Sequence, residues 1–312
     1  MLKNTTVNFF KGVIILSFHF SAPGVKSSVT GLWHFSCRIC TLCLCFFLFG
    51  CVSSVSGKLA ENLSCAVASN NDLETVKTGG PAYLLMIDGL LRDDPENETL
   101  LRAGANLYTA YTEMYVEDRE RAEKLTDKAL DYAFRALCSG PGLCDLRKTD
   151  FTGFAASVRN TDKKDVPFLF TLGSAWGGWI QTRKADWNAV ADIARVEILM
   201  QRVVELDETW QHGSAHLYLG ILSTLIPPAL GGKPEEGRRH FERAMEISGG
   251  KNFMVMVSYA RQYARLVFDR ELHDRLLHAV VDANPETEGY TLINTLARQQ
   301  AKELLENADD YF

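Results

Sequence analysis

Apolar residues recur at helical spacing along most of the chain. Val190, Ile193, Val196 and Met200, for example, follow one another at intervals of three or four residues, which places them on one face of an α-helix. No segment alternates apolar and polar residues for long enough to predict a β-strand. The pattern therefore predicts an all-α domain of roughly ten or eleven helices over residues 79–312.

Three helices are expected to begin at the same short motif, in which a glutamate follows a proline. The motif occurs as Asp94-Pro95-Glu96, Lys233-Pro234-Glu235 and Asn284-Pro285-Glu286. Proline suits the first turn of a helix because its missing N–H has no partner there, and the glutamate favours the positive end of the helix dipole. The motif predicts helix starts at these three prolines.

A frame of small and bulky residues occurs twice, the second copy 115 residues after the first. Small residues in such a frame let two antiparallel helices approach closely, as in the tetratricopeptide hairpin. We therefore expect a helical array of degenerate tetratricopeptide-like (TPR-like) hairpins, of the α-solenoid type. The first copy comprises Leu101, Gly104, Ala105, Tyr108, Ala122, Thr126 and Ala129, and the second His216, Leu219, Gly220, Ser223, Gly237, Phe241 and Ala244.

The start of the chain differs from the rest. Residues 1–50 contain four basic residues and no Asp or Glu, and an uninterrupted apolar run occupies residues 39–50. This run is too short for a helix that crosses about 30 Å of hydrocarbon. Its length suits the apolar region of an export signal.

The apolar run ends in the letters LFGC at residues 48–51. This ending resembles the lipobox of bacterial lipoproteins, in which the cysteine accepts the lipid, although Phe49 stands where a smaller residue is usual. We expect residues 1–50 to be a lipoprotein-type signal peptide and residues 51–78 a flexible tether. Cys51 would carry palmitate and anchor the chain to a membrane in the bacterial periplasm. The alternatives are a secretory leader with a chance cysteine, or an uncleaved N-terminal anchor.

The chain after the leader is acidic. All 39 Asp and Glu residues of the 312-residue chain lie after residue 50, with 29 of its 33 Lys and Arg residues, so the net charge there is about −10. Nucleic-acid phosphates need a basic surface, so we expect no nucleic-acid partner. Hydrophobic residues make up 46% and charged residues 23% of the chain, as in ordinary globular domains.

Three cysteines remain for the folded domain once the leader and Cys51 are set aside: Cys65, Cys138 and Cys144. Cys138 and Cys144 flank a Gly-Pro-Gly turn, and exported domains fold in a compartment that permits disulfides. The pair is therefore a candidate disulfide. The alternative is two buried thiols.

The sequence lacks the usual catalytic and metal-binding motifs. His212 and His216 would share a helix face, but Gly213 stands where a zinc protease carries its catalytic glutamate. The Gly-Gly-Lys run at residues 231–233 lacks the upstream glycine and the following Ser or Thr of a phosphate-binding loop. We therefore expect no metal, no cofactor and no enzymatic activity.

Four of the five tryptophans gather in one part of the chain: Trp176, Trp179, Trp187 and Trp210. Trp176 and Trp179 are three residues apart and share a helix face, and neighbouring glycines leave space around their rings. One interpretation is that the four rings fill a core between helices. The functional interpretation is that they line the apolar wall of a ligand cleft or passage.

Several stretches resemble one family in particular. From about residue 80 onward the chain is similar to the TatT component of TRAP transporters associated with tetratricopeptide proteins. The most specific stretch begins at Pro227. The stretches are PAYLLMIDGLL from Pro81, LFTLGSAWGGWIQ from Leu169, ELDETWQHGSAHLYLG from Glu205, PPALGGKPEEGRRHFERAMEISGGKNFM from Pro227 and LINTLARQQAKELLENADDYF from Leu292.

The resemblance implies a lipid-anchored helical protein that works beside the periplasmic solute-binding protein of a TRAP transporter. It also implies a small apolar or organic-acid ligand and a homotrimer with a passage through its middle. A different hypothesis for the same helical repeats is an envelope scaffold lipoprotein that binds other proteins in its repeat groove. An exported hydrolase of an unrecognised type is a third hypothesis.

Overall fold

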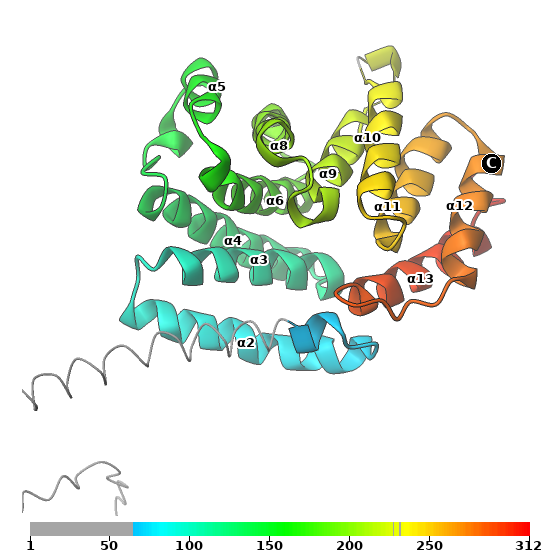
Figure 1. Cartoon of the computed structure of the whole chain (residues 1–312), viewed down its shortest axis with the longest axis horizontal. Coiled ribbons are helices and arrows are strands. Elements are labelled where there is room, and N and C mark those ends of the chain that lie inside the picture. Colours follow the sequence, from blue (N-terminus) through cyan, green and yellow to red (C-terminus); the bar gives the residue numbers. More distant parts are fainter. Residues whose placement is uncertain (1–64, 227, 231) are drawn as a thin grey trace, which may run out of the picture. The chain divides into compact units, whose positions relative to one another are not determined.

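The computed structural model describes residues 65–226, 228–230 and 232–312 (Figure 1). The predicted leader and Cys51 lie outside these residues, so the signal peptide and the lipidation stay predictions. Within the described residues every regular element is a helix, which confirms the predicted all-α class. The helix labels follow Figure 1 and start at α2.

The helices of the described residues differ widely in length. The longer ones are α2 (Leu73–Asp93), α3 (Glu98–Tyr115), α4 (Arg119–Ser139), α5 (Phe151–Arg159), α6 (Val166–Thr182), α8 (Ile193–Asp207), α9 (Ser214–Ser223), α10 (Pro234–Ile247), α12 (Arg270–Asp282) and α13 (Thr291–Glu306). The shorter ones are α7 (Trp187–Ala191), α11 (Phe253–Ser258), the 3-10 helices η1 (Leu146–Lys148), η2 (Lys163–Asp165), η3 (Trp210–Gly213) and η4 (Pro228–Leu230), and the π-helix η5 (Tyr259–Ala264).

Helices that are close in the sequence pack beside one another in an array. α2, α3, α4 and α6 lie side by side, and each contacts the next (Figure 1). α8 packs on α6, α9 on α8 and α10 on α9, while α11, α12 and α13 contact one another near the C-terminus. Short connections between helices produce this arrangement, because they keep neighbours in the chain close in space.

Two hydrophobic clusters form the interior of the array. The first extends from α2 to α9, and the second from α10 to α13. α9 contributes to both, because Leu219 belongs to the first cluster while Leu217 and Ile221 pack against the second. This helix therefore joins the two parts of the core.

Both copies of the small-residue frame fall on pairs of packed helices. The first copy lies on α3 and α4, where a Cβ at Gly104 would come within 2.8 Å of the Tyr132 ring. The second lies on α9 and α10, where a Cβ at Gly220 would come within 2.8 Å of the Phe241 ring. The glycines therefore permit the close approach that the frame predicts. The origin of these pairs in tetratricopeptide repeats stays a prediction.

A polar cluster ties α2 to the two helices beyond it. The Asp88 carboxylate accepts hydrogen bonds from the hydroxyls of Tyr108 on α3 (2.8 Å) and Tyr132 on α4 (2.7 Å). Lys128 on α4 forms an ion pair with the same carboxylate at 2.5 Å. Burial opposes the ionisation of Asp88, but Lys128 and the two hydroxyls outweigh it and lower the pKa. The carboxylate therefore stays charged at the junction.

The predicted helix start at Pro234 is confirmed, whereas α3 begins later than predicted. α10 starts at Pro234. α3 starts at Glu98, because the Asn97 side chain accepts a hydrogen bond from the Leu100 N–H and caps the helix. The helix start predicted at Pro95 is therefore wrong, because α3 begins three residues later.

The start predicted at Pro285 is also wrong. The Asn284 side chain accepts a hydrogen bond from the Glu286 N–H, which forms a local turn instead of a helix cap. Gly289 follows with a φ of +76°, a left-handed conformation that interrupts a helix. α13 begins only at Thr291.

At the N-terminal end the first long helix begins earlier than the boundary expected at residue 79. α2 starts at Leu73 and contains Pro81 in its interior. The Asp72 side chain accepts hydrogen bonds from the N–H groups of Glu74 and Thr75 and so caps the helix. Helical structure therefore includes part of the segment expected to be tether.

Candidate functional site

Trp176 lies in the first hydrophobic cluster. Its side chain is 4% exposed, and its ring packs edge-on against Phe134 and Phe154 at centroid distances of 5.1 and 5.9 Å. This is the favoured geometry for aromatic pairs in a core. Trp176 therefore fills space between α4, α5 and α6.

Trp179 lies one turn further along α6 in a polar setting. Its indole N–H donates a hydrogen bond to Asp127 on α4 (2.7 Å). Arg183 lies over the ring and pairs with the same carboxylate at 2.8 Å. Trp179 therefore ties α6 to α4 at the surface.

The other two tryptophans lie apart from this pair. Trp187 begins α7 and is 85% exposed. Trp210 begins η3 and packs, half-buried, against the first hydrophobic cluster. The structure does not bring the four rings together around one cavity. A ligand-lining role for them stays a prediction.

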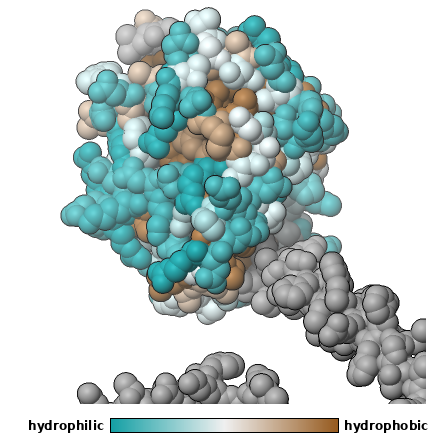
Figure 2. Space-filling view, turned by 90° about the vertical axis from the view of Figure 1, so that its left-hand side faces the viewer, coloured by the Kyte–Doolittle hydropathy of each residue, from teal (hydrophilic) through white to brown (hydrophobic). Residues whose placement is uncertain are grey.

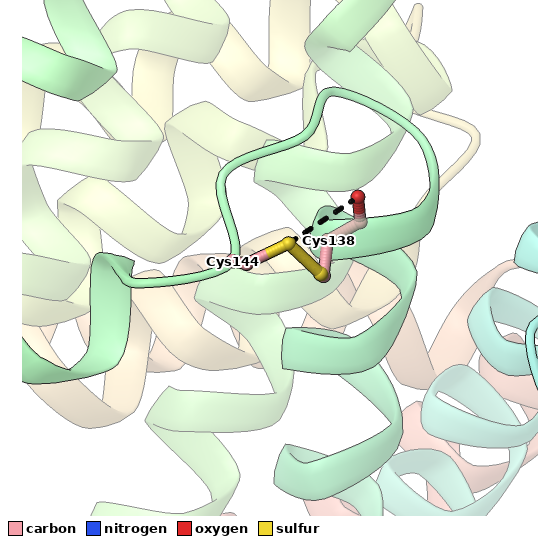
Figure 3. Close-up of a disulfide and its surroundings, with 2 residues drawn as sticks. All are labelled: Cys138 and Cys144. Carbon is pink, nitrogen blue, oxygen red and sulfur yellow. Dashed lines mark hydrogen bonds between the residues drawn. A yellow bond between two sulfur atoms is a disulfide. The ribbon is translucent and has the colours of Figure 1, made fainter.

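A disulfide joins Cys138, at the end of α4, to Cys144 in the loop that follows (Figure 3). The chain turns within this loop at Gly142, whose φ of +77° suits glycine. Cys65 is exposed and free. The face of the array at this end of α4 is mostly hydrophilic, with one larger hydrophobic patch in its upper middle and smaller ones near its lower edge (Figure 2).

A pocket of about 460 Å³ opens between the adjoining ends of α3, α4 and α6. This volume lies within the range of small-molecule sites. Polar and apolar atoms line the pocket in similar measure, and it carries charges of both signs. The lining includes Glu113 near the end of α3, Glu117 in the turn after it, Arg119 at the start of α4, Gln181 and Thr182 at the end of α6, and Lys184 in the turn that follows.

Two glycines of α6 make room for side chains of other helices beside this pocket. A Cβ at Gly178 would come within 3.2 Å of the Glu113 carboxylate, and one at Gly177 within 3.7 Å of the Tyr218 ring on α9. Glu113 is exposed to solvent on the wall of this open pocket. Partial desolvation of its carboxylate by the protein nearby raises its pKa to about 7. Burial, and then the Glu113 carboxylate, also raise the pKa of Tyr218.

Sequence reasoning did not select Glu113 or Tyr218 as site residues. The glycine pair at residues 177–178 was the signal for space beside α6. We expected that space to lie around the rings of Trp176 and Trp179. A single sequence does not show which side chains from distant helices fill such a space. The pocket is therefore a finding of the structure.

His212 and His216 do not share a helix face, so that prediction is wrong. His212 has a φ of +57° within η3, and its ring lies 5.5 Å from that of Tyr290. His216 on α9 instead faces His240 on α10, with their Nδ1 atoms 2.8 Å apart. One ring must donate and the other accept. Burial lowers the pKa of both, that of His240 to about 4, so the pair is neutral at pH 7.

Two further properties concern metals and membranes. Across residues 65–226, 228–230 and 232–312, no group of three or more His, Cys, Asp or Glu side chains is arranged to hold a metal ion. In that same part of the chain, no helix combines the length and the apolar character that crossing a membrane requires.

The fold and the pocket define the class of protein, an all-helical array with a pocket of small-molecule size lined by charged and apolar residues. A family model described as TRAP transporter T-component matches residues 69–312. This match covers most of the chain, so the chain belongs to the TRAP transporter T-component family, and its role is accessory to a TRAP transporter. No curated protein matches the chain.

Proposed function

We propose that the protein is a non-enzymatic periplasmic lipoprotein that docks the solute-binding protein of a TRAP transporter. In this role it helps to pass a small apolar or organic-acid ligand. The observation that carries the proposal is the match of the T-component family model to residues 69–312. The paired helices α3–α4 and α9–α10, interpreted as TPR-like hairpins of an α-solenoid, support it because stacked helix pairs form extended binding surfaces.

The pocket between α3, α4 and α6 supports the ligand part of this proposal. Its volume of about 460 Å³ suits a small organic molecule. Its charged and hydroxyl-bearing lining favours an organic acid over a purely apolar ligand.

The proposal includes a lipid anchor on Cys51 after removal of residues 1–50. Twenty-two residue steps separate Cys51 from Leu73, where α2 begins, so the distance between the lipid and this helix is at most about 80 Å. This reach lets the helical domain contact partners close to the membrane. Replacing Cys51 with Ala should move the processed protein from the detergent phase to the aqueous phase. Retention in the detergent phase would contradict lipidation at Cys51.

The outer face of α2 supports assembly of the chain into a homotrimer. Leu85 is 71% exposed, and Met86 and Leu90 are also exposed. Together with Ala82 and Gly89 they follow the spacing of one helix face. An exposed apolar stripe of this kind commonly marks a contact with another protein chain.

Affinity purification of the tagged full-length chain from the cell envelope tests the proposed function. The expected main partner is the solute-binding protein of a TRAP transporter. Recovery of envelope-assembly factors without that protein would contradict the transport role and favour the scaffold hypothesis.

A further inference from the structure

A group of apolar side chains lies exposed at the C-terminal end of the array. Phe268, in the turn between η5 and α12, is 71% exposed, and Tyr311, in the tail after α13, is 45% exposed. Their rings stack with centroids 6.2 Å apart, and the Phe312 ring meets both of them edge-on. Val267 is exposed beside them. These four residues form the C-terminal apolar patch, and exposed apolar surface of this kind commonly marks a contact with another molecule.

The backbone at Phe268 adopts a conformation that suits glycine. Its φ is +57°, in the left-handed region, which costs a bulky residue free energy. The Asp269 N–H donates a hydrogen bond to the Ala264 carbonyl at 2.8 Å, as at helix ends where glycine usually occupies the residue before. The Phe268 ring is mostly exposed, so it gains little core packing in return. Strained positions of this kind cluster at functional sites.

Contacts with η5 and α12 hold the tail and its rings in place. The Arg265 guanidinium lies over the Tyr311 ring, 4.6 Å from its centroid. Asp309 in the tail forms an ion pair with Arg270 on α12 at 2.5 Å. Since the rings are already fixed, a partner that covers them causes little loss of side-chain freedom.

The charge around the C-terminal apolar patch is negative. Residues 268–312 contain ten Asp and Glu residues and four Lys and Arg residues, a net charge of −6. Glu306 and Asp310 are exposed close to Tyr311 in the sequence, and neither takes part in the ion pairs of the described residues. A complementary partner therefore presents Lys or Arg side chains around an apolar hollow.

The same charge argues against two other occupants of the patch. A second copy of the chain that met the patch across a two-fold axis would bring the same acidic side chains together. A membrane surface with anionic headgroups would repel those side chains as well. A basic protein surface is the occupant that the charge favours.

From these observations we propose that the C-terminal apolar patch docks the solute-binding protein of the transporter, through a surface whose apolar hollow is bordered by Lys and Arg. Phe268 enters the hollow, and Glu306 and Asp310 pair with its basic border. The assignment rests on the proposed function and deepens it, because it names the docking surface and the chemistry of the surface that it meets.

Biolayer interferometry between the purified full-length chain and the purified solute-binding protein of the same transporter tests the proposal. Phe268→Asn removes the ring, and asparagine tolerates the left-handed conformation. We expect its Kd to rise about tenfold or more, and its melting temperature to stay within about 2 °C of wild type. A residue that only held the tail in place would show the reverse, a lower melting temperature and an unchanged Kd.

Phe151→Ala is the matched control, because it removes an exposed phenyl ring from α5 (50% exposed). Its Kd should stay within about twofold of wild type. Asp310→Asn should lower the association rate about twofold to threefold and weaken the dependence of that rate on salt.

Three results would overturn the proposal while leaving the proposed function in place. They are an unchanged Kd in Phe268→Asn, an equal loss of affinity in Phe151→Ala, and a wild-type association rate that does not fall as salt is added. A loss of self-association in Phe268→Asn, followed by sedimentation, would assign the patch to a second copy and overturn it as well. Absence of binding by the wild-type chain would contradict the proposed function, and this docking surface with it.

Discussion

At the scale of single residues, the glycine pair at 177–178 shows both the reach and the limit of sequence reasoning. The glycines were expected to leave space around the rings of Trp176 and Trp179, but side chains from other helices fill the space beside this pair. Its occupants are Glu113 and Tyr218, which come from helices about 40 to 65 residues away in the chain. Helical spacing indicates which residues of one helix share a face, but the neighbours across that face depend on tertiary packing.

Trp176 and Trp187 differ in how far their side chains are buried, so their truncation should have different effects on stability. Trp176→Ala should lower the free energy of unfolding by about 3–5 kcal/mol, because the ring is buried against Phe134 and Phe154. Trp187→Ala should change it by less than about 0.5 kcal/mol, because that side chain is exposed. Urea unfolding followed by circular dichroism measures both values. Similar effects at the two positions would contradict their placement.

The environment of Glu113 predicts a dependence of stability on pH. The folded chain keeps this proton up to about pH 7, whereas the ordinary pKa of a glutamate is 4.5. The folded state therefore binds more protons in this range, and its stability falls as pH rises through it. Glu113→Gln cannot ionise, so it should melt at a higher temperature than wild type at pH 8 and at a similar temperature at pH 4.

Thermal melts from pH 4 to 8 measure this difference. Glu117→Gln, in the turn after α3 and on the wall of the same pocket, should show no such trend. A constant difference between Glu113→Gln and wild type across the pH range would mean that Glu113 is solvated like a surface carboxylate.

At the scale of secondary-structure elements, helix faces were easier to predict than helix ends. Val196 and Met200 are buried on α8, as their spacing predicts. Asp94 and Asn97 are both good N-cap residues, and the sequence does not rank them. Asn97 caps α3, and its amide also donates a hydrogen bond to the Asp94 carboxylate at 2.9 Å. That contact exists only in the folded turn, so spacing alone could not reveal it.

The close contact between α9 and α10 can be tested with two glycines. Gly220→Ala should destabilise the protein by about 1–3 kcal/mol, because the new methyl group would meet the Phe241 ring. Gly79→Ala on α2 should stabilise it by about 0.5–1 kcal/mol, since a Cβ there meets nothing within 4 Å and alanine favours helix. Denaturant unfolding compares the two variants. Changes of the same sign would argue against the packing described for α9 and α10.

At the scale of the whole molecule, the all-α class followed from the apolar pattern, and part of the architecture was also visible in it. Leu217, Leu219 and Ile221 make α9 apolar on more than one side, which is typical of a helix buried between neighbours. This helix does contact both hydrophobic clusters. The surface proposed to pair with other chains has no comparable signature, because an exposed apolar stripe looks in the sequence like a second buried face.

Assembly through the outer face of α2 gives a further prediction. Leu85→Glu introduces a charge into the exposed apolar stripe and should shift the sedimenting species from trimer towards monomer. Lys77→Glu, at an exposed position of α2 away from that stripe, should leave the trimer intact. A trimer that persists in Leu85→Glu, or a wild-type chain that sediments as a monomer, would contradict assembly through this face.

The central claim is that this T-component family member docks the solute-binding protein of a TRAP transporter. Sedimentation velocity on the purified full-length chain, mixed with the purified solute-binding protein of the same transporter, tests it most directly. The account predicts a saturable complex with a Kd of about micromolar strength, as expected for partners that must exchange. Independent sedimentation of the two proteins, at concentrations where the solute-binding protein still delivers solute to its permease, would contradict it.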